Sequence, residues 1–160
     1  MLIQNRRKAL YISSLLFVSI LLIVLLFFRF YQLFTIEGDS MSPALQDGQA
    51  YWVERGPMEP RRGDIVIFYN QEDDFNHVKR VVALADERIQ IKESRVLVNG
   101  KPLDEPYLAS DATTTDFGPV TVPQGEVFVL GDNREQSLDS RQLGTVSIMD
   151  IRGRMLNPER

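Results

Sequence analysis

The chain begins with one long apolar stretch. Residues 9–28 contain no charged side chain, and a helix of that length, at about 1.5 Å per residue, spans the roughly 30 Å hydrocarbon core of a bilayer. No polar face interrupts the stretch, which argues against a buried helix of a soluble domain. A cleaved secretory signal would have a shorter apolar core and a small-residue cleavage site, whereas Arg29 and several aromatic residues follow here. The pattern therefore predicts a retained transmembrane helix over residues 9–29.

The rest of the chain shows a different pattern. Short apolar segments alternate with turn-forming residues, which is typical of β-structure, and no segment after residue 36 has helical periodicity over three turns. Asn99-Gly100 is a strong hairpin signal, and Gly56-Pro57, Gly118-Pro119 and Pro123–Gly125 indicate further turns. We therefore expect a mainly β fold, an antiparallel sheet domain attached to one helix. The predicted strands are Ala50–Glu54, Asp64–Tyr69, His77–Ala83, Arg88–Lys92, Arg95–Val98 and Glu126–Leu130.

The charges around the apolar stretch predict its orientation. Arg6, Arg7 and Lys8 precede it and Arg29 alone lies at its far end, so the N-terminus is expected to remain in the cytoplasm. We expect a single-pass protein of the cell membrane in contact with lipid, with Tyr31 and nearby phenylalanines at the interface. Residues 1–8 would be the cytoplasmic N-terminus, residues 9–29 the transmembrane helix, and residues 30–160 an extracytoplasmic domain.

Composition narrows the possible functions. Residues 37–160 hold 14 of the 18 cations and all 22 acids, a net charge of −8, which argues against a nucleic-acid partner. One histidine and no cysteine give poor zinc ligation, and no phosphate-binding glycine loop is present. We therefore expect no metal and no other cofactor.

Three segments contain residues that could carry chemistry. Ser40 lies in GDSMSP directly after the membrane exit, where glycine and proline can also indicate a simple turn. A serine nucleophile needs a base, and both His77 and Lys79 lie on one face of the predicted strand at 77–83. A lysine can act as a base only if burial lowers its pKa, and an edge-strand lysine in water is the common alternative. The third segment, GDNREQSLDSR at 131–141, is either a solvated loop or a network of paired charges.

Together these segments resemble the bacterial signal peptidase I (leader peptidase) family. The matching stretches are GDSMSPAL at 38–45, RRGDIVIF at 61–68, VKRVV at 78–82 and GDNREQSLDSR at 131–141, in the family's order and after an N-terminal apolar helix. The small domain is similar to the compact, Gram-positive-type members. The resemblance implies a membrane-bound serine endopeptidase that removes N-terminal signal peptides from secretory precursors, which carry small residues at positions −1 and −3.

The resemblance also implies a role for individual residues. Ser40 matches the nucleophile, Lys79 the general base, and Ser137 a serine that hydrogen-bonds to and orients that lysine. Arg80 with Asp132, and Asp139 with Arg141, match charge pairs that support the site. The substrate pocket would be lined by Phe34, Ile36, Met41, Leu45, His77 and Val78.

The chain departs from the family's usual sequence at three positions. Gly38 stands where some members have a second oxyanion donor, His77 where a tyrosine is usual, and Ala85-Asp86-Glu87 replaces a Pro-Gly-Asp turn. Two other functions remain open. One is a Ser-Lys peptidase of different purpose, such as a mitochondrial inner-membrane peptidase or a self-cleaving repressor. The other is an anchored β module that binds precursors without cutting them.

Overall fold

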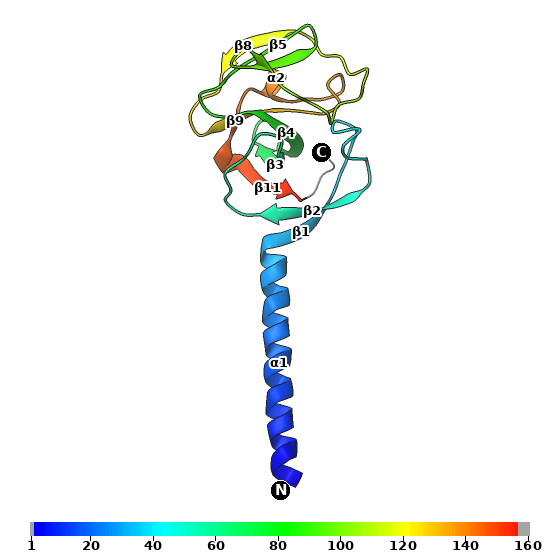
Figure 1. Cartoon of the computed structure of the whole chain (residues 1–160), viewed down its shortest axis with the longest axis vertical. Helices are drawn as coiled ribbons and strands as arrows, with labels where there is room; N and C mark the ends of the chain where they lie inside the picture. Colours follow the sequence, from blue (N-terminus) through cyan, green and yellow to red (C-terminus); the bar gives the residue numbers. More distant parts are fainter. Residues whose placement is uncertain (1, 157–160) are drawn as a thin grey trace.

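The chain consists of one long N-terminal helix joined to a β domain, as the computed structural model in Figure 1 shows. The structure describes residues 2–156, with side chains from residue 11 onward, so Met1 of the predicted N-terminal segment and residues 157–160 of the predicted domain lie outside the described residues. Helix α1 spans Leu2–Phe30. Its segment Tyr11–Phe30 has a mean hydropathy of 2.7 and no part of it is buried against the domain. The predicted apolar helix is present, and α1 extends beyond it at both ends.

The remainder is built mainly from short strands. All six predicted strands are present, with ends within two residues of those expected. Two short helical elements lie among the last strands, the one-turn helix α2 (Ser140–Leu143) and the 3₁₀ turn Ile148–Asp150. The strands are β1 Tyr31–Thr35, β2 Ala50–Arg55, β3 Ile65–Asn70, β4 Phe75–Ala83, β5 Arg88–Lys92, β6 Arg95–Val98, β7 Lys101–Pro102, β8 Phe117–Thr121, β9 Glu126–Leu130, β10 Val146–Ser147 and β11 Ile151–Met155.

The strands form two antiparallel sheets, which confirms the predicted fold class. The larger sheet has the order β1-β2-β11-β3-β4-β9-β10, and the smaller has the order β7-β6-β5-β8. In Figure 1 the smaller sheet lies at the end of the domain farthest from α1, while β1 continues directly from the helix. The Asn99-Gly100 hairpin is confirmed, since both residues have positive φ between β6 and β7.

One predicted turn is wrong. Gly118-Pro119 lies inside β8, where the pairing with β5 shifts register between Ile89 and Ile91. β8 is an edge strand, so the missing N–H of a proline there costs no sheet hydrogen bond on its open side. A proline and a glycine that indicate a turn in the sequence therefore mark an irregular edge strand.

Three apolar clusters form the core, and one of them supports the segment that follows β1. Ile36, Met41 and Leu45 pack with Val53 and Ile65, and all five side chains are buried. The other two clusters lie around β5, β6 and β9, and around β3, β4 and β9. The chain between β1 and β2 contains no long helix, and the burial of these three side chains, Ile36, Met41 and Leu45, holds it against the domain.

Candidate active site

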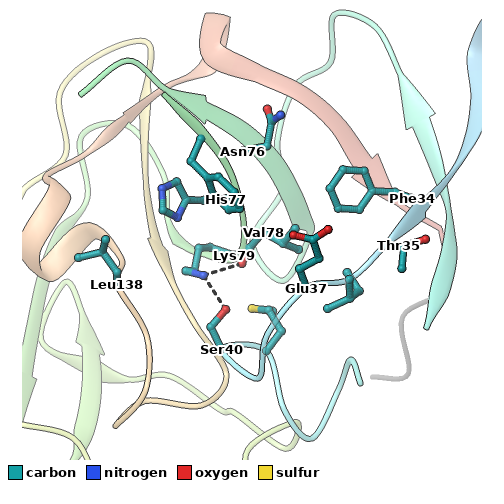
Figure 2. Close-up of a pocket in the computed structure, with 12 residues that line it drawn as sticks. Phe34, Thr35, Glu37, Ser40, Asn76, His77, Val78, Lys79 and Leu138 are labelled. Atoms are coloured by element: carbon teal, nitrogen blue, oxygen red, sulfur yellow. Dashed lines mark hydrogen bonds between the residues drawn. The ribbon is translucent and has the colours of Figure 1, made fainter. Parts of the chain in front are cut away.

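Two strand edges that have no paired strand in the described part of the chain flank a cavity. Within residues 2–156, β1 pairs only with β2, and Ile36 continues this pairing through hydrogen bonds with Gln49 and Gly48. The backbone groups of Thr35 and Glu37 therefore face the other way. Residues 75–79 of β4 pair with β3, and pairing with β9 begins only at Arg80. Figure 2 shows these two segments on opposite sides of the cavity.

Ser40 lies at the base of this cavity, in a tight turn after β1. Gly38 has φ of +86°, which favours glycine, and its amide donates to Asp47 Oδ1 over 2.8 Å. The next side chain, Met41, is 1% exposed and packs into the core. The position of the Ser40 hydroxyl at the cavity is thus fixed from both sides, by the Gly38–Asp47 hydrogen bond before it and by the buried Met41 side chain after it.

Lys79 reaches Ser40 from β4. Its Nζ donates to Ser40 Oγ over 2.7 Å and to the carbonyl oxygen of Val78 over 2.9 Å. The side chain is 3% exposed, and burial lowers the pKa of its ammonium to about 8, while the carboxylates of Asp139 and Asp132 oppose that shift. A substantial neutral fraction at mildly alkaline pH makes this amine competent to accept a proton from Ser40.

The segment from Gly131 holds the Ser40 turn in place. The Asn133 amide donates to the Ser40 carbonyl oxygen over 3.0 Å, and Asn133 Nδ2 donates to the Asp39 carbonyl over 3.2 Å. A Cβ atom on Gly131 would lie 2.1 Å from Ser137 Oγ and 2.6 Å from Ser40 O. Only glycine therefore allows this close approach between the two segments.

Both predicted charge pairs are formed. Arg80 and Asp132 make two hydrogen bonds of 2.8 and 2.6 Å with almost no exposure, and the Arg80 guanidinium lies 3.9 Å from the Tyr107 ring centroid. Arg141 binds Asp139 through two bonds of 2.8 Å. Asp139 also caps α2 and accepts from the Gly131 amide over 3.0 Å. The segment 131–141 is therefore a paired network rather than a solvated loop.

Ser137 does not make the expected contact with lysine. Its Oγ is buried and has no hydrogen-bond partner among residues 2–156. The hydroxyl instead lies against Gly131, beside the turn that carries Ser40. Its role in orienting Lys79 stays a prediction.

The cavity has a volume of about 390 Å³ and includes five of the six predicted wall residues. Leu45 is the exception. Its side chain has no exposed surface and belongs to the core behind Met41, so the prediction that it lines the pocket is wrong. The sequence reasoning missed Thr35, Glu37, Phe75, Asn76 and Leu138. The lining residues are Phe34, Thr35, Ile36, Glu37, Ser40, Met41, Phe75, Asn76, His77, Val78, Lys79 and Leu138.

His77 bonds away from Ser40. Its Nε2 lies 2.7 Å from Asp73 Oδ2, and its ring stacks on Phe68 with a centroid distance of 5.5 Å. Asp73 is a partner that no sequence motif indicated. The imidazole therefore forms a wall of the cavity, while Lys79 is the basic side chain in hydrogen-bond contact with the Ser40 hydroxyl.

Sequence comparisons place this geometry in a known family. The family described as "Signal peptidase, peptidase S26" matches residues 9–158. The chain belongs to this family. The resemblance inferred from the four motifs is thus confirmed, and the protein is a hydrolase, a serine endopeptidase of the signal peptidase type. Membership supports an activity in removing signal peptides.

Individual relatives and a solved structure support the same family assignment. The chain is 37% identical over 149 residues to signal peptidase I of Bacillus licheniformis, covering 85% of this chain and 80% of the relative. It is 39% identical over 134 residues to signal peptidase I S of Bacillus subtilis, covering 75% and 72%. The crystal structure of a signal peptidase I from Enterococcus faecalis matches with a TM-score of 0.55 and 30% identity, covering 64% of this chain and all of that one.

Proposed function

We propose that this peptidase removes N-terminal signal peptides from secretory precursors with Ser40 as nucleophile and Lys79 as general base. The observation that carries the proposal is the 2.7 Å contact between Lys79 Nζ and Ser40 Oγ, made by a lysine that is 3% exposed. A lysine in water holds its proton at neutral pH, whereas burial penalises the charged form.

The two open strand edges support binding of an extended substrate. A peptide between Thr35–Glu37 and Asn76–Val78 would extend the sheet on both sides through its backbone. Alternate side chains would then point to the cavity floor, where Ile36 and Met41 are buried. A cavity of about 390 Å³ whose floor is formed by these buried side chains suits small residues at positions −1 and −3.

The reaction follows from the contacts of Ser40. Neutral Lys79 takes the hydroxyl proton as Ser40 Oγ bonds to the carbonyl carbon of the last signal-peptide residue. The Ser40 amide, which has no acceptor among residues 2–156, would stabilise the oxyanion, whereas the Gly38 amide is occupied by Asp47. The C–N bond breaks and the leaving amine takes the proton from Lys79. Water then gives a proton to Lys79 as its oxygen bonds to the acyl carbon. The ester bond to Ser40 Oγ breaks, and Ser40 Oγ takes the proton from Lys79, which restores the hydroxyl and the neutral amine.

The apolar helix supports a membrane-anchored enzyme that works beside its substrates. The segment Tyr11–Phe30 is long and apolar enough to cross a bilayer, and β1 starts at the next residue. The basic residues before the helix favour an extracytoplasmic domain. Anchoring enzyme and signal peptide in one bilayer raises their effective concentration, so weak contacts in the cavity are sufficient.

The test uses the full chain in detergent with a purified precursor that has alanine at −1 and −3. Mass spectrometry of the product should give a new N-terminus directly after the −1 residue. Ser40→Ala and Lys79→Ala should each abolish the product while retaining the circular dichroism spectrum, and the double variant should lose no more, because the two residues act together. Near-normal turnover by either single variant would refute the dyad. Cleavage at an unrelated bond would refute the substrate assignment.

A further inference from the structure

One carboxylate in the cavity has no partner among the residues that the structure describes. Glu37 is exposed, lines the cavity, and makes no ion pair or side-chain hydrogen bond within the described part of the chain. Figure 2 shows its carboxylate directed into the space between Val78 and Phe34. Asp73 and Asp132, by contrast, are paired with His77 and Arg80. An unpaired charge at the mouth of an apolar cavity is available to a substrate.

The position of Glu37 on the strand edge indicates which substrate residue it meets. Phe34 and Ile36 turn toward the core, whereas Thr35 and Glu37 are exposed on the open side of the cavity. An extended peptide that places residues −1 and −3 on the floor must turn residue −2 to the open side. Side chains on the same face of neighbouring strands interact, so residue −2 would share the open face with Thr35 and Glu37, of which only Glu37 carries a charge.

We propose that Glu37 is a specificity-determining residue that favours precursors with lysine or arginine at position −2. The inference rests on the proposed signal-peptide cleavage and adds a substrate class to it. A cation at −2 would lie close to the Glu37 carboxylate. The net charge of −8 on residues 37–160 adds a general attraction for cations. The site remains open to solvent, so the preference is modest and decreases as salt is added.

The effect of Glu37 is on substrate selection and not on the general base. The carboxylates that raise the pKa of Lys79 are those of Asp139 and Asp132, and Glu37 is not among them. Loss of the Glu37 charge should therefore change the selectivity ratio between substrates and leave the pH profile of cleavage in place. A variant that disturbed the dyad would shift that profile.

The experiment compares precursor peptides that differ only at −2, with lysine, glutamine or glutamate, cleaved by the full chain at low salt. The readout is the ratio of kcat/KM for the lysine peptide to that for the glutamine peptide. Wild type should favour lysine by roughly three- to fivefold, near the upper limit for an exposed ion pair. Glu37→Gln should bring the ratio to about one, and Glu37→Lys should favour the glutamate peptide. Glu59→Gln, the same change at an exposed residue away from the cavity, should keep the wild-type ratio.

Each other result contradicts the proposal. A lysine-to-glutamine ratio that Glu37→Gln leaves unchanged, with cleavage still at the −1 bond, would refute the role of Glu37 and leave the proposed function intact. An equal loss of preference in Glu59→Gln would assign the effect to net charge. Folded Glu37 variants that cut no peptide would give Glu37 a role in the chemistry instead. Failure of wild type to cut after −1 would overturn both proposals.

Discussion

The backbone amide of Asn133 donates to the carbonyl oxygen of Ser40 over 3.0 Å, and this bond joins two segments that lie more than ninety residues apart in the chain. Asn133 belongs to the same segment as Gly131, Ser137 and Asp139, so the turn that carries Ser40 and the charge network form one unit. Changes in the network should therefore appear as changes in catalysis.

Gly131→Ala should lower kcat by about a hundredfold, because a displacement of about 1 Å at a reacting group has effects of that size. The added Cβ would lie 2.1 Å from Ser137 Oγ and 2.6 Å from Ser40 O, so the Ser40 turn must move. Ser137→Gly removes two of the three close contacts, those with Ser137 Oγ and Cβ, so adding Gly131→Ala to Ser137→Gly should lower kcat less than adding it to the wild type. Steady-state kinetics of the single and double variants measure this. A Gly131→Ala protein with normal kcat would show that the approach is not required.

Ser137→Ala should stabilise the fold and still reduce turnover. The Ser137 hydroxyl is buried without a partner among the described residues, and removing such a group should add about 1 kcal/mol to the free energy of unfolding. If the hydroxyl orients Lys79 once substrate is bound, kcat falls, though less than in Lys79→Ala. Urea unfolding and cleavage assays on the same preparations test both parts. Lower stability with unchanged kcat would contradict both.

Asp139→Asn should shift the pH profile to lower pH. The Asp139 carboxylate raises the pKa of Lys79, so removing its charge lowers that pKa and allows the neutral amine at lower pH. The change also leaves Arg141 without its buried partner, at a cost of about 3–5 kcal/mol in stability. Asp104→Asn, at an exposed position, is the matched control. The profile is measured at a temperature where both variants are folded. A profile that stays in place or moves to higher pH would be inconsistent with this account.

Protease added to intact spheroplasts should digest the domain after residue 30. The expectation comes from Arg6, Arg7 and Lys8 before the apolar helix. Immunoblotting against the domain follows the loss of full-length protein, and a cytoplasmic marker confirms that the cells stay closed. Protection until lysis would mean the opposite topology.

Much of the site could be predicted because the relevant signals are local. The residue patterns alone left a simple turn open for Ser40 and left His77 open beside Lys79. The resemblance carried by the four motifs selected Ser40 and Lys79, and the alternating segments gave six strands. Contacts that depend on how the chain turns had no signal in the sequence. The pairing of His77 with Asp73 depends on the turn between β3 and β4, and Leu45 is buried because the chain after Met41 turns back into the core. The position of Leu45 five residues after Ser40 suggested a pocket residue and did not reveal that its side chain points into the core.

The pH dependence of kcat/KM for precursor cleavage tests the Ser40–Lys79 mechanism most directly. Only the neutral amine of Lys79 can accept the Ser40 proton, so activity should be low where the amine is charged and should rise with a midpoint at pH about 8. His77→Tyr should keep that rising limb, since His77 bonds to Asp73 and not to Ser40. A rising limb near pH 6.5, about the ordinary pKa of histidine, that disappears in His77→Tyr would contradict the account.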